Sequence, residues 1–116
     1  MHFKLIIALV DERQTKAIML SAREAGATGA TVVGAARGEG LEPKKTFFGL
    51  NLESQRDMLM FIVEEHLSRH VLEHISATGG FEDNPGSGLA FQIDVQDTIG
   101  LRSQIEVISE EVEEEL

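Results

Sequence analysis

One pattern occurs twice in this 116-residue chain, and it limits the possible folds more than any other feature. In each half, a short apolar run precedes a stretch whose apolar residues have helical spacing, and a second strand-like run follows. The first unit occupies residues 3–36 and the second occupies residues 58–95. Two strand–helix–strand units joined by a long loop predict a ferredoxin-like βαββαβ sandwich of the α+β class, with two helices on one face of four antiparallel strands.

The first unit shows the expected start and stop signals. Residues 3–10 form an Ile/Leu/Val-rich run typical of a central strand. Asp11 is a predicted helix N-cap, with Gln14 as its capping-box partner. Gly26 is the expected helix end, and residues 30–36 are the second predicted strand. One face of the helix carries three apolar residues at i, i+4 and i+7, namely Ile18, Ala22 and Ala25.

The second unit repeats this order. Residues 58–63 form a buried-strand pattern, and residues 64–65 are both Glu, which favours a helix start. The apolar stripe of this helix is Leu67, Val71 and Ile75. Glycines at 79–80 end it, the loop 82–88 is rich in turn formers, and residues 89–95 are the fourth strand. Because these strands are apolar on both sides, we expect the face without helices to be buried against other subunits.

Composition excludes several classes of function. Without Cys there is no thiolate metal site, disulfide or cysteine nucleophile, and a cytoplasmic location is expected. The formal charge is −10, of which five charges come from the Glu residues between positions 110 and 115. These lie in a predicted acidic tail, residues 105–116, and a single domain is expected over 1–104. An acidic surface repels phosphate backbones, so nucleic acid is not an expected partner. No apolar run reaches the length of a membrane span or has the flanks of a signal peptide.

Catalytic residues are not predicted. The serines lie in no nucleophile setting, since Ser87 within Pro85–Gly88 precedes a strand rather than a helix. A histidine stripe at i, i+4 and i+8 is the weak candidate for a metal site, because a pair with this spacing can chelate zinc. The stripe consists of His66, His70 and His74. The alternative is a row of half-buried imidazoles at the edge of the core stripe, with no metal.

Two loops are candidates for ligand or partner contacts. Residues 37–55 form a long loop, or a loose hairpin with residues 46–48 at its edge, and loops of this length are usually functional. Its expected partner-contact residues are Lys44, Lys45, Phe47 and Phe48. The glycines of 37–40 and 86–88 allow backbone N–H groups to approach an anion closely, although neither loop matches a P-loop or dinucleotide fingerprint. Two ordinary tight turns are the alternative.

Four segments in this order resemble the P-II family of signalling proteins. They are AREAGATGATV at 22–32, RGEG at 37–40, ATGG followed by GSGLAF within 77–91, and DV followed by IGLR within 94–102. The resemblance covers about residues 3–104. It implies a homotrimer that binds ATP or ADP in the clefts between subunits. It also implies that the long loop docks on a transporter or metabolic enzyme, so nitrogen regulation or another signalling role is expected.

The same resemblance assigns site residues one by one. Thr31 matches a threonine near the adenine, and the glycines match those beneath the phosphates. The implied nucleotide-binding residues are Thr31, Arg37, Gly38, Gly40, Gly86, Ser87, Gly88 and Arg102. The sequence departs from the family where Leu89 replaces a lysine, where Gly100 replaces the first of two arginines, and where no Tyr is available for modification. AMP, a cyclic dinucleotide or another anion therefore stays open beside ATP and ADP, as does a trimeric interaction module that binds no nucleotide.

Overall fold

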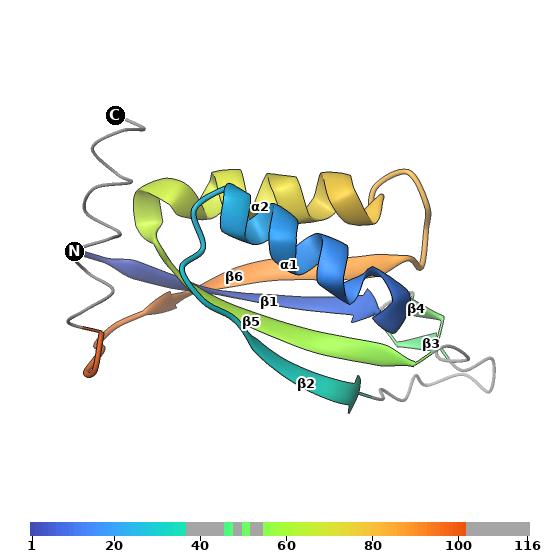
Figure 1. The fold of residues 1–116 in the computed structure, drawn as a ribbon, viewed down its shortest axis with the longest axis horizontal. Helices are drawn as coiled ribbons and strands as arrows, with labels where there is room; N and C mark the ends of the chain where they lie inside the picture. The colour runs from blue at the N-terminus through green and yellow to red at the C-terminus, as the bar shows by residue number, and fades with distance from the viewer. Residues whose placement is uncertain (37–45, 48–49, 52–54, 102–116) are drawn as a thin grey trace.

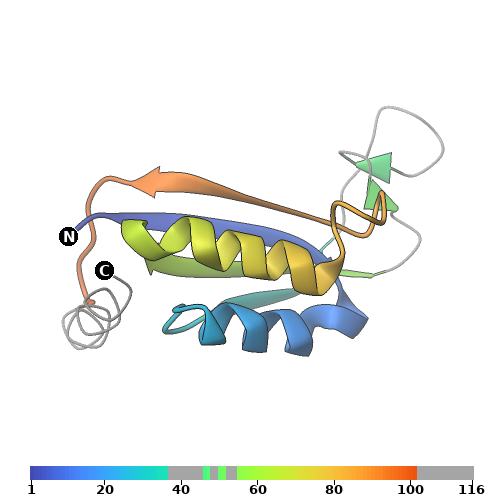
Figure 2. The same cartoon turned by 90° about the horizontal axis from the view of Figure 1, so that it is seen from above.

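The computed structural model describes residues 1–36, 46–47, 50–51 and 55–101. Four strands form an antiparallel sheet in the order β2-β5-β1-β6, and two helices cover one of its faces (Figure 1). The elements are β1 (Phe3–Asp11), α1 (Thr15–Glu24), β2 (Thr31–Ala36), β5 (Arg56–Glu64), α2 (Glu65–Gly79) and β6 (Gly88–Val95). Figure 2 shows α1 and α2 side by side from above. The predicted ferredoxin-like fold is confirmed.

The core lies between the helices and the sheet. Alternate residues of the two central strands point into it, and β1 and β5 are paired so that Ile6 lies opposite Phe61 and Ala8 opposite Leu59. All four of these side chains are almost fully buried. The predicted helix stripes complete the core with Ile18, Ala22, Ala25, Leu67, Val71 and Ile75, each at most 4 % exposed.

The opposite face of the sheet is apolar but is not covered by a described helix (Figure 1). Phe91 is 40 % exposed and Ile93 is 48 % exposed, and both lie on the edge strand β6. Their neighbours on β1 are Ile7 and Leu5. An apolar sheet face that is open in one chain favours association with further copies.

The helix ends match the predictions except at the start of α1. Gly26 has φ 124° and follows the last turn of α1, while Gly80 has φ 65° and caps α2. Asp11 does cap a helical turn, but the turn is the 3₁₀ segment η1 (Glu12–Gln14). Because this turn intervenes, α1 begins at Thr15, and Gln14 makes no side-chain capping bond. The predicted capping box is therefore wrong.

The long loop contains a short antiparallel pair, β3 (Thr46–Phe47) with β4 (Leu50–Asn51), as the hairpin alternative predicted. The remaining loop residues 37–45, 48–49 and 52–54 lie outside the described residues, as does the predicted tail from 102 onward. Neither α1 nor α2, in the part of the chain that is described, has the length and apolar character needed to cross a bilayer.

Candidate functional site

A buried arginine holds the second glycine loop in place. Arg56 is the first residue of β5 and is only 5 % exposed. Its Nη1 donates to the carbonyl oxygen of Ser87 and its Nη2 donates to that of Gly86, both at 2.8 Å. A guanidinium that spans two successive carbonyls fixes the orientation of the peptide between them, because its donors form a rigid planar fork.

The loop also closes on itself. The backbone N–H of Asn84 donates to the carbonyl of Gly80 at 3.0 Å, and the N–H of Ser87 donates to the carbonyl of Asn84 at 3.0 Å. The Ser87 hydroxyl adds a bond to the Gly80 carbonyl at 3.2 Å. Gly86 has φ 82°, which a side chain would disfavour. These bonds make the segment between α2 and β6 a defined double turn.

Packing against Phe81 requires a glycine at position 88. Phe81 packs against the core cluster, and a Cβ placed on Gly88 or on Gly79 would overlap its ring. Gly88 also pairs with Val10 in the ladder between β1 and β6. Its missing side chain therefore lets Phe81 close the end of the sandwich. Gly86, in contrast, lies at the surface of the groove described next.

A groove of about 480 Å³ lies where this loop meets the ends of β1 and β5. Its lining residues are Asp11, Arg13, Gln14, Arg56, Pro85, Gly86 and Ser87. Two arginines and one aspartate give this lining a formal charge of +1, on a chain whose total is −10. The groove is therefore locally favourable to an anion.

The Asp11 carboxylate organises the cationic side of the groove. Its oxygens accept from Nε of Arg13 at 3.0 Å and from Nη2 at 2.9 Å. This bond to the Arg13 guanidinium outweighs desolvation and lowers the pKa of Asp11 to about 2. The Arg13 side chain is 83 % exposed, so the fork is held by Asp11 yet faces solvent.

A second hollow has the opposite electrostatic character. It measures about 460 Å³ and lies between α2 and β6, where Leu72, Phe81 and Ala90 form part of its apolar lining. Arg69, Glu73, Glu82 and Asp83 also line it, which gives a formal charge of −2. Because this charge repels phosphate, the groove beside Arg13 is the better candidate for an anionic ligand.

The structure brings together only part of the predicted site. Gly86 and Ser87 line the groove. Thr31 lines a different hollow, of about 470 Å³, on the open sheet face with Leu5, Met60 and Ile62. Since Thr31 pairs with Met60 and Ala36 with Arg56, Thr31 lies roughly 13 Å along β5 from the groove. Four predicted residues lie outside the described residues: Arg37, Gly38, Gly40 and Arg102. Of the partner-loop residues, Lys44, Lys45 and Phe48 are outside too, and Phe47 lies in β3.

Sequence reasoning missed Arg13 and Arg56. The strand was expected to begin at residue 58, which left Arg56 in the loop. Extending the two-residue alternation of β5 backward by one step would have placed it on the strand, on the face opposite Leu59. Arg13 follows Asp11 at a spacing that permits a local ion pair, but nothing in the sequence shows that the pair borders the glycine loop.

The histidine stripe is more exposed than one of the two interpretations predicted. His66, His70 and His74 are all exposed, so the prediction of half-buried imidazoles is wrong. On this amphipathic helix the three histidines lie beside the buried apolar stripe, on its solvent-exposed side. In the described residues, the group of three metal-ligand side chains that lie close together is Glu64, Glu65 and His66.

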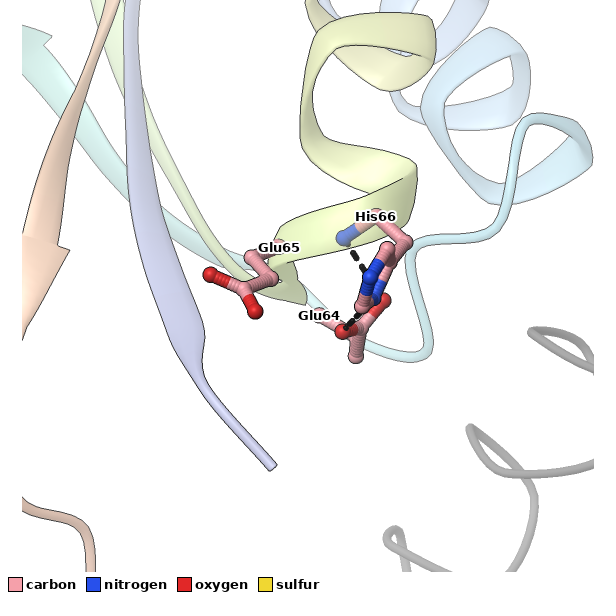
Figure 3. Close-up of side chains that lie close together, drawn as sticks. All are labelled: Glu64, Glu65 and His66. Carbon is pink, nitrogen blue, oxygen red and sulfur yellow. Dashed lines mark hydrogen bonds and ion pairs between the residues drawn. The ribbon is translucent and has the colours of Figure 1, made fainter.

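Figure 3 shows that this group is a helix cap. Glu64 is 3 % exposed; its Oε2 accepts from the backbone N–H of His66 at 2.7 Å, and its Oε1 lies 2.6 Å from Nδ1 of His66. Glu65 points away from this pair. Both oxygens of Glu64 are thus engaged at the first turn of α2, and a metal ion would have to displace these capping bonds.

The comparisons with known proteins agree with the fold. The family model described as "Nitrogen regulatory protein P-II" matches residues 3–105. The chain therefore belongs to the P-II family of signalling proteins. No curated protein matches it.

Solved structures show the same fold at low sequence identity. The apo form of CPII from Thiomonas intermedia, a nitrogen regulatory PII-like protein, is 23 % identical with a TM-score of 0.66, over 86 % of this chain and 96 % of that one. CPII bound to ADP, AMP and acetate is 22 % identical with a TM-score of 0.59, over 83 % and 90 %. A protein described as PII-like and signalling, from Thermus thermophilus, is 22 % identical with a TM-score of 0.60, over 81 % and 86 %.

Proposed function

We propose that this P-II family protein senses an adenine nucleotide at subunit clefts and regulates a transporter or metabolic enzyme through residues 37–55. The observation that carries the proposal is the groove at the glycine loop, which has a positive lining in an acidic chain. A phosphorylated effector fits this charge, and a regulatory role fits the family. The protein is accordingly not proposed to be an enzyme.

The phosphate end of the effector is assigned to the groove. Arg13 presents an exposed guanidinium there, and the peptide groups of Gly86 and Ser87 lie in an orientation that Arg56 fixes. The family resemblance adds Arg37, Gly38, Gly40 and Arg102 around the phosphates, with Gly88 in the same loop. Thr31, on the open sheet face, is assigned to the adenine in a cleft completed by a second subunit.

The effector is expected to carry few phosphates. Leu89 stands where the family has a lysine, and Gly100, with φ 102°, stands where it has an arginine. Each loss removes a charge-assisted hydrogen bond of about 1.5–3 kcal/mol. AMP, ADP or a cyclic dinucleotide is therefore favoured over ATP. Support comes from CPII, whose solved structures are described as bound to ADP and AMP.

The open apolar face is assigned to a homotrimer. Phe91 and Ile93 are exposed on it in one chain, and burying them between subunits would also form the nucleotide clefts. Sedimentation velocity at micromolar concentration should give a trimer, and Ile93→Lys should shift it toward monomers. A wild-type protein that sediments as a stable monomer would contradict both the trimer and the clefts.

The partner contact is assigned to the long loop. Lys44, Lys45, Phe47 and Phe48 combine charge with apolar surface, which suits docking on a metabolic enzyme or on the cytoplasmic face of a transporter. Deleting residues 41–46 should leave the trimer and nucleotide affinity unchanged and should remove regulation of the partner. Retention of regulation in the deletion variant would contradict this assignment.

Calorimetry at low ionic strength tests the effector site. AMP, ADP, ATP and cyclic di-AMP are titrated into wild type, Arg13→Ala, Arg102→Ala and, as a matched control, Arg23→Ala on the exposed side of α1. Affinity should fall about tenfold or more in the first two variants and stay unchanged in the control. If no nucleotide binds below millimolar concentration while the trimer persists, a trimeric interaction module without nucleotide is the correct function.

A further inference from the structure

Two histidines one helical turn apart form a compact pair on the exposed side of α2. The ring centroids of His70 and His74 lie 4.4 Å apart, with their planes at 62°. Both residues are exposed. His66, one turn earlier on the same stripe, is engaged with Glu64 and does not join them.

The backbone beneath this pair is firmly held. The Ser21 hydroxyl of α1 donates to the carbonyl of His74 at 3.2 Å, and Thr78 donates to the Ser21 hydroxyl at 2.8 Å. α2 is also capped at both ends, by Glu64 and by Gly80. Ligands on a rigid helix lose no backbone entropy when they close on an ion, so the separation of the two Cβ atoms is set in advance.

The ring spacing can be compared with the separations that different metal geometries require. An imidazole nitrogen binds a divalent transition metal at roughly 2.0–2.1 Å, so two rings at a 90° ligand angle have centroids roughly 4.5 Å apart. At a tetrahedral angle the separation is roughly 5.2 Å. The observed 4.4 Å matches the 90° angle of square-planar or octahedral coordination. Imidazole ligands in this geometry suit Cu²⁺ and Ni²⁺.

We propose that His70 and His74 form a two-histidine site for Cu²⁺ or Ni²⁺, separate from the anion groove. The remaining coordination positions are open to water, because no third ligand side chain lies close to the pair within the described residues. Cu²⁺ binds more tightly than Ni²⁺ or Zn²⁺ at such a site. The net charge of −10 on the chain favours the approach of a cation.

The test uses the full chain and Cu²⁺ as the probe. Titration calorimetry is run in a weakly chelating buffer at neutral pH on wild type, His70→Ala, His74→Ala and two controls. His66→Ala removes the remaining histidine of the stripe, and His2→Ala removes the one histidine of the chain that lies outside the stripe. Electron paramagnetic resonance of the copper-loaded protein counts the coordinating imidazole nitrogens.

Wild type should bind one Cu²⁺ per chain through two imidazole nitrogens. His70→Ala and His74→Ala should each lower the affinity by about tenfold or more, because one of two protein–metal bonds is lost. Both controls should bind like wild type. An equal loss in His66→Ala or His2→Ala, a single coordinating nitrogen in wild type, or unchanged affinity in His74→Ala would overturn the proposal. Because His70 and His74 are exposed, thermal unfolding without metal should be the same for His70→Ala and His74→Ala as for wild type.

Discussion

The two ends of β5 each carry a buried charged residue, and the two residues act over very different distances along the chain. Arg56, at the start, bonds to carbonyls 30 and 31 residues away. Glu64, at the end, bonds to His66, two residues away. Both are at most 5 % exposed. Burial alone therefore does not separate a residue that shapes a site from one that ends a strand and caps a helix.

The number of residues between each side chain and its hydrogen-bond partners makes that distinction. A local cap stabilises one helix end and leaves the rest of the molecule unaffected. A long-range clamp couples the start of a strand to a loop that follows it by thirty residues, so the shape of the groove depends on it. Each end of β5 can be tested separately, and the comparison predicts different combinations of stability and binding defects.

Replacing the long-range residue should have the largest effect. Arg56→Met removes both donors and leaves the carbonyls of Gly86 and Ser87 without these partners, so the free energy of unfolding should fall by about 3 kcal/mol. Nucleotide affinity of the folded protein should fall as well. Urea unfolding and calorimetry measure the two quantities. The matched control is Arg69→Met, which removes an exposed pair with Glu73 and should cost less than about 0.5 kcal/mol.

Replacing the local residue should affect stability alone. Glu64→Ala removes the N-cap bond and the contact with His66, so the free energy of unfolding should fall by about 1–2 kcal/mol. Nucleotide affinity should stay at the wild-type value, because the cap lies at the far end of β5 from the groove. Glu65→Ala, the neighbouring carboxylate that points away from the pair, is the control. A loss of affinity in Glu64→Ala would show that both ends of β5 shape the site.

Acid should weaken the groove end through Asp11. Interaction with Arg13 holds the pKa of Asp11 at about 2 in the folded protein, below its ordinary value of 3.8. The stabilisation is therefore fully present above about pH 4 and is lost as the pH falls through about 2. Because Arg13 is largely exposed, solvent screening keeps this contribution small. Asp11→Asn should flatten that part of the pH–stability curve, measured by urea unfolding.

The sequence predicted the features that depend on local spacing. Alternation along residues 3–10 and the i, i+4, i+7 stripe of α1 determine which side chains enter the core, and the structure confirms both. Gly26 and Gly80 were also found, because a left-handed residue at a helix end has few alternatives to glycine. The one local error, Gln14 as a capping partner, arose because Asp11 and Arg13 first close a 3₁₀ turn.

The candidate site was less accessible to sequence reasoning because its contacts are non-local. Arg56 bonds to Gly86 only after β5, β1 and β6 are aligned in one sheet, and no short motif encodes that register. The packing of Gly88 was not predicted for the same reason, since its close neighbour Phe81 is identified only by the packed structure. Family resemblance pointed to Gly86 and Ser87, which line the groove, but it carried no information on Arg13, for which no family position was matched.

The smallest expected effect is a gain of binding at the groove end. Leu89 pairs with Leu9, and Arg56 pairs with Asp11, so by strand alternation all four lie on the open sheet face near the glycine loop. Leu89→Lys places a cation there and should raise the affinity for ADP about fivefold in calorimetry, because a charge-assisted contact to phosphate is partly screened at an open site. Val95→Lys, on the same face at the other end of β6, is the control and should leave the affinity unchanged.

Both variants must still sediment as wild type, since the same face is assigned to the trimer. An equal gain from both lysines would mean that net charge alone governs nucleotide binding. A gain confined to Leu89→Lys would place the phosphate at the Arg56 end of β5.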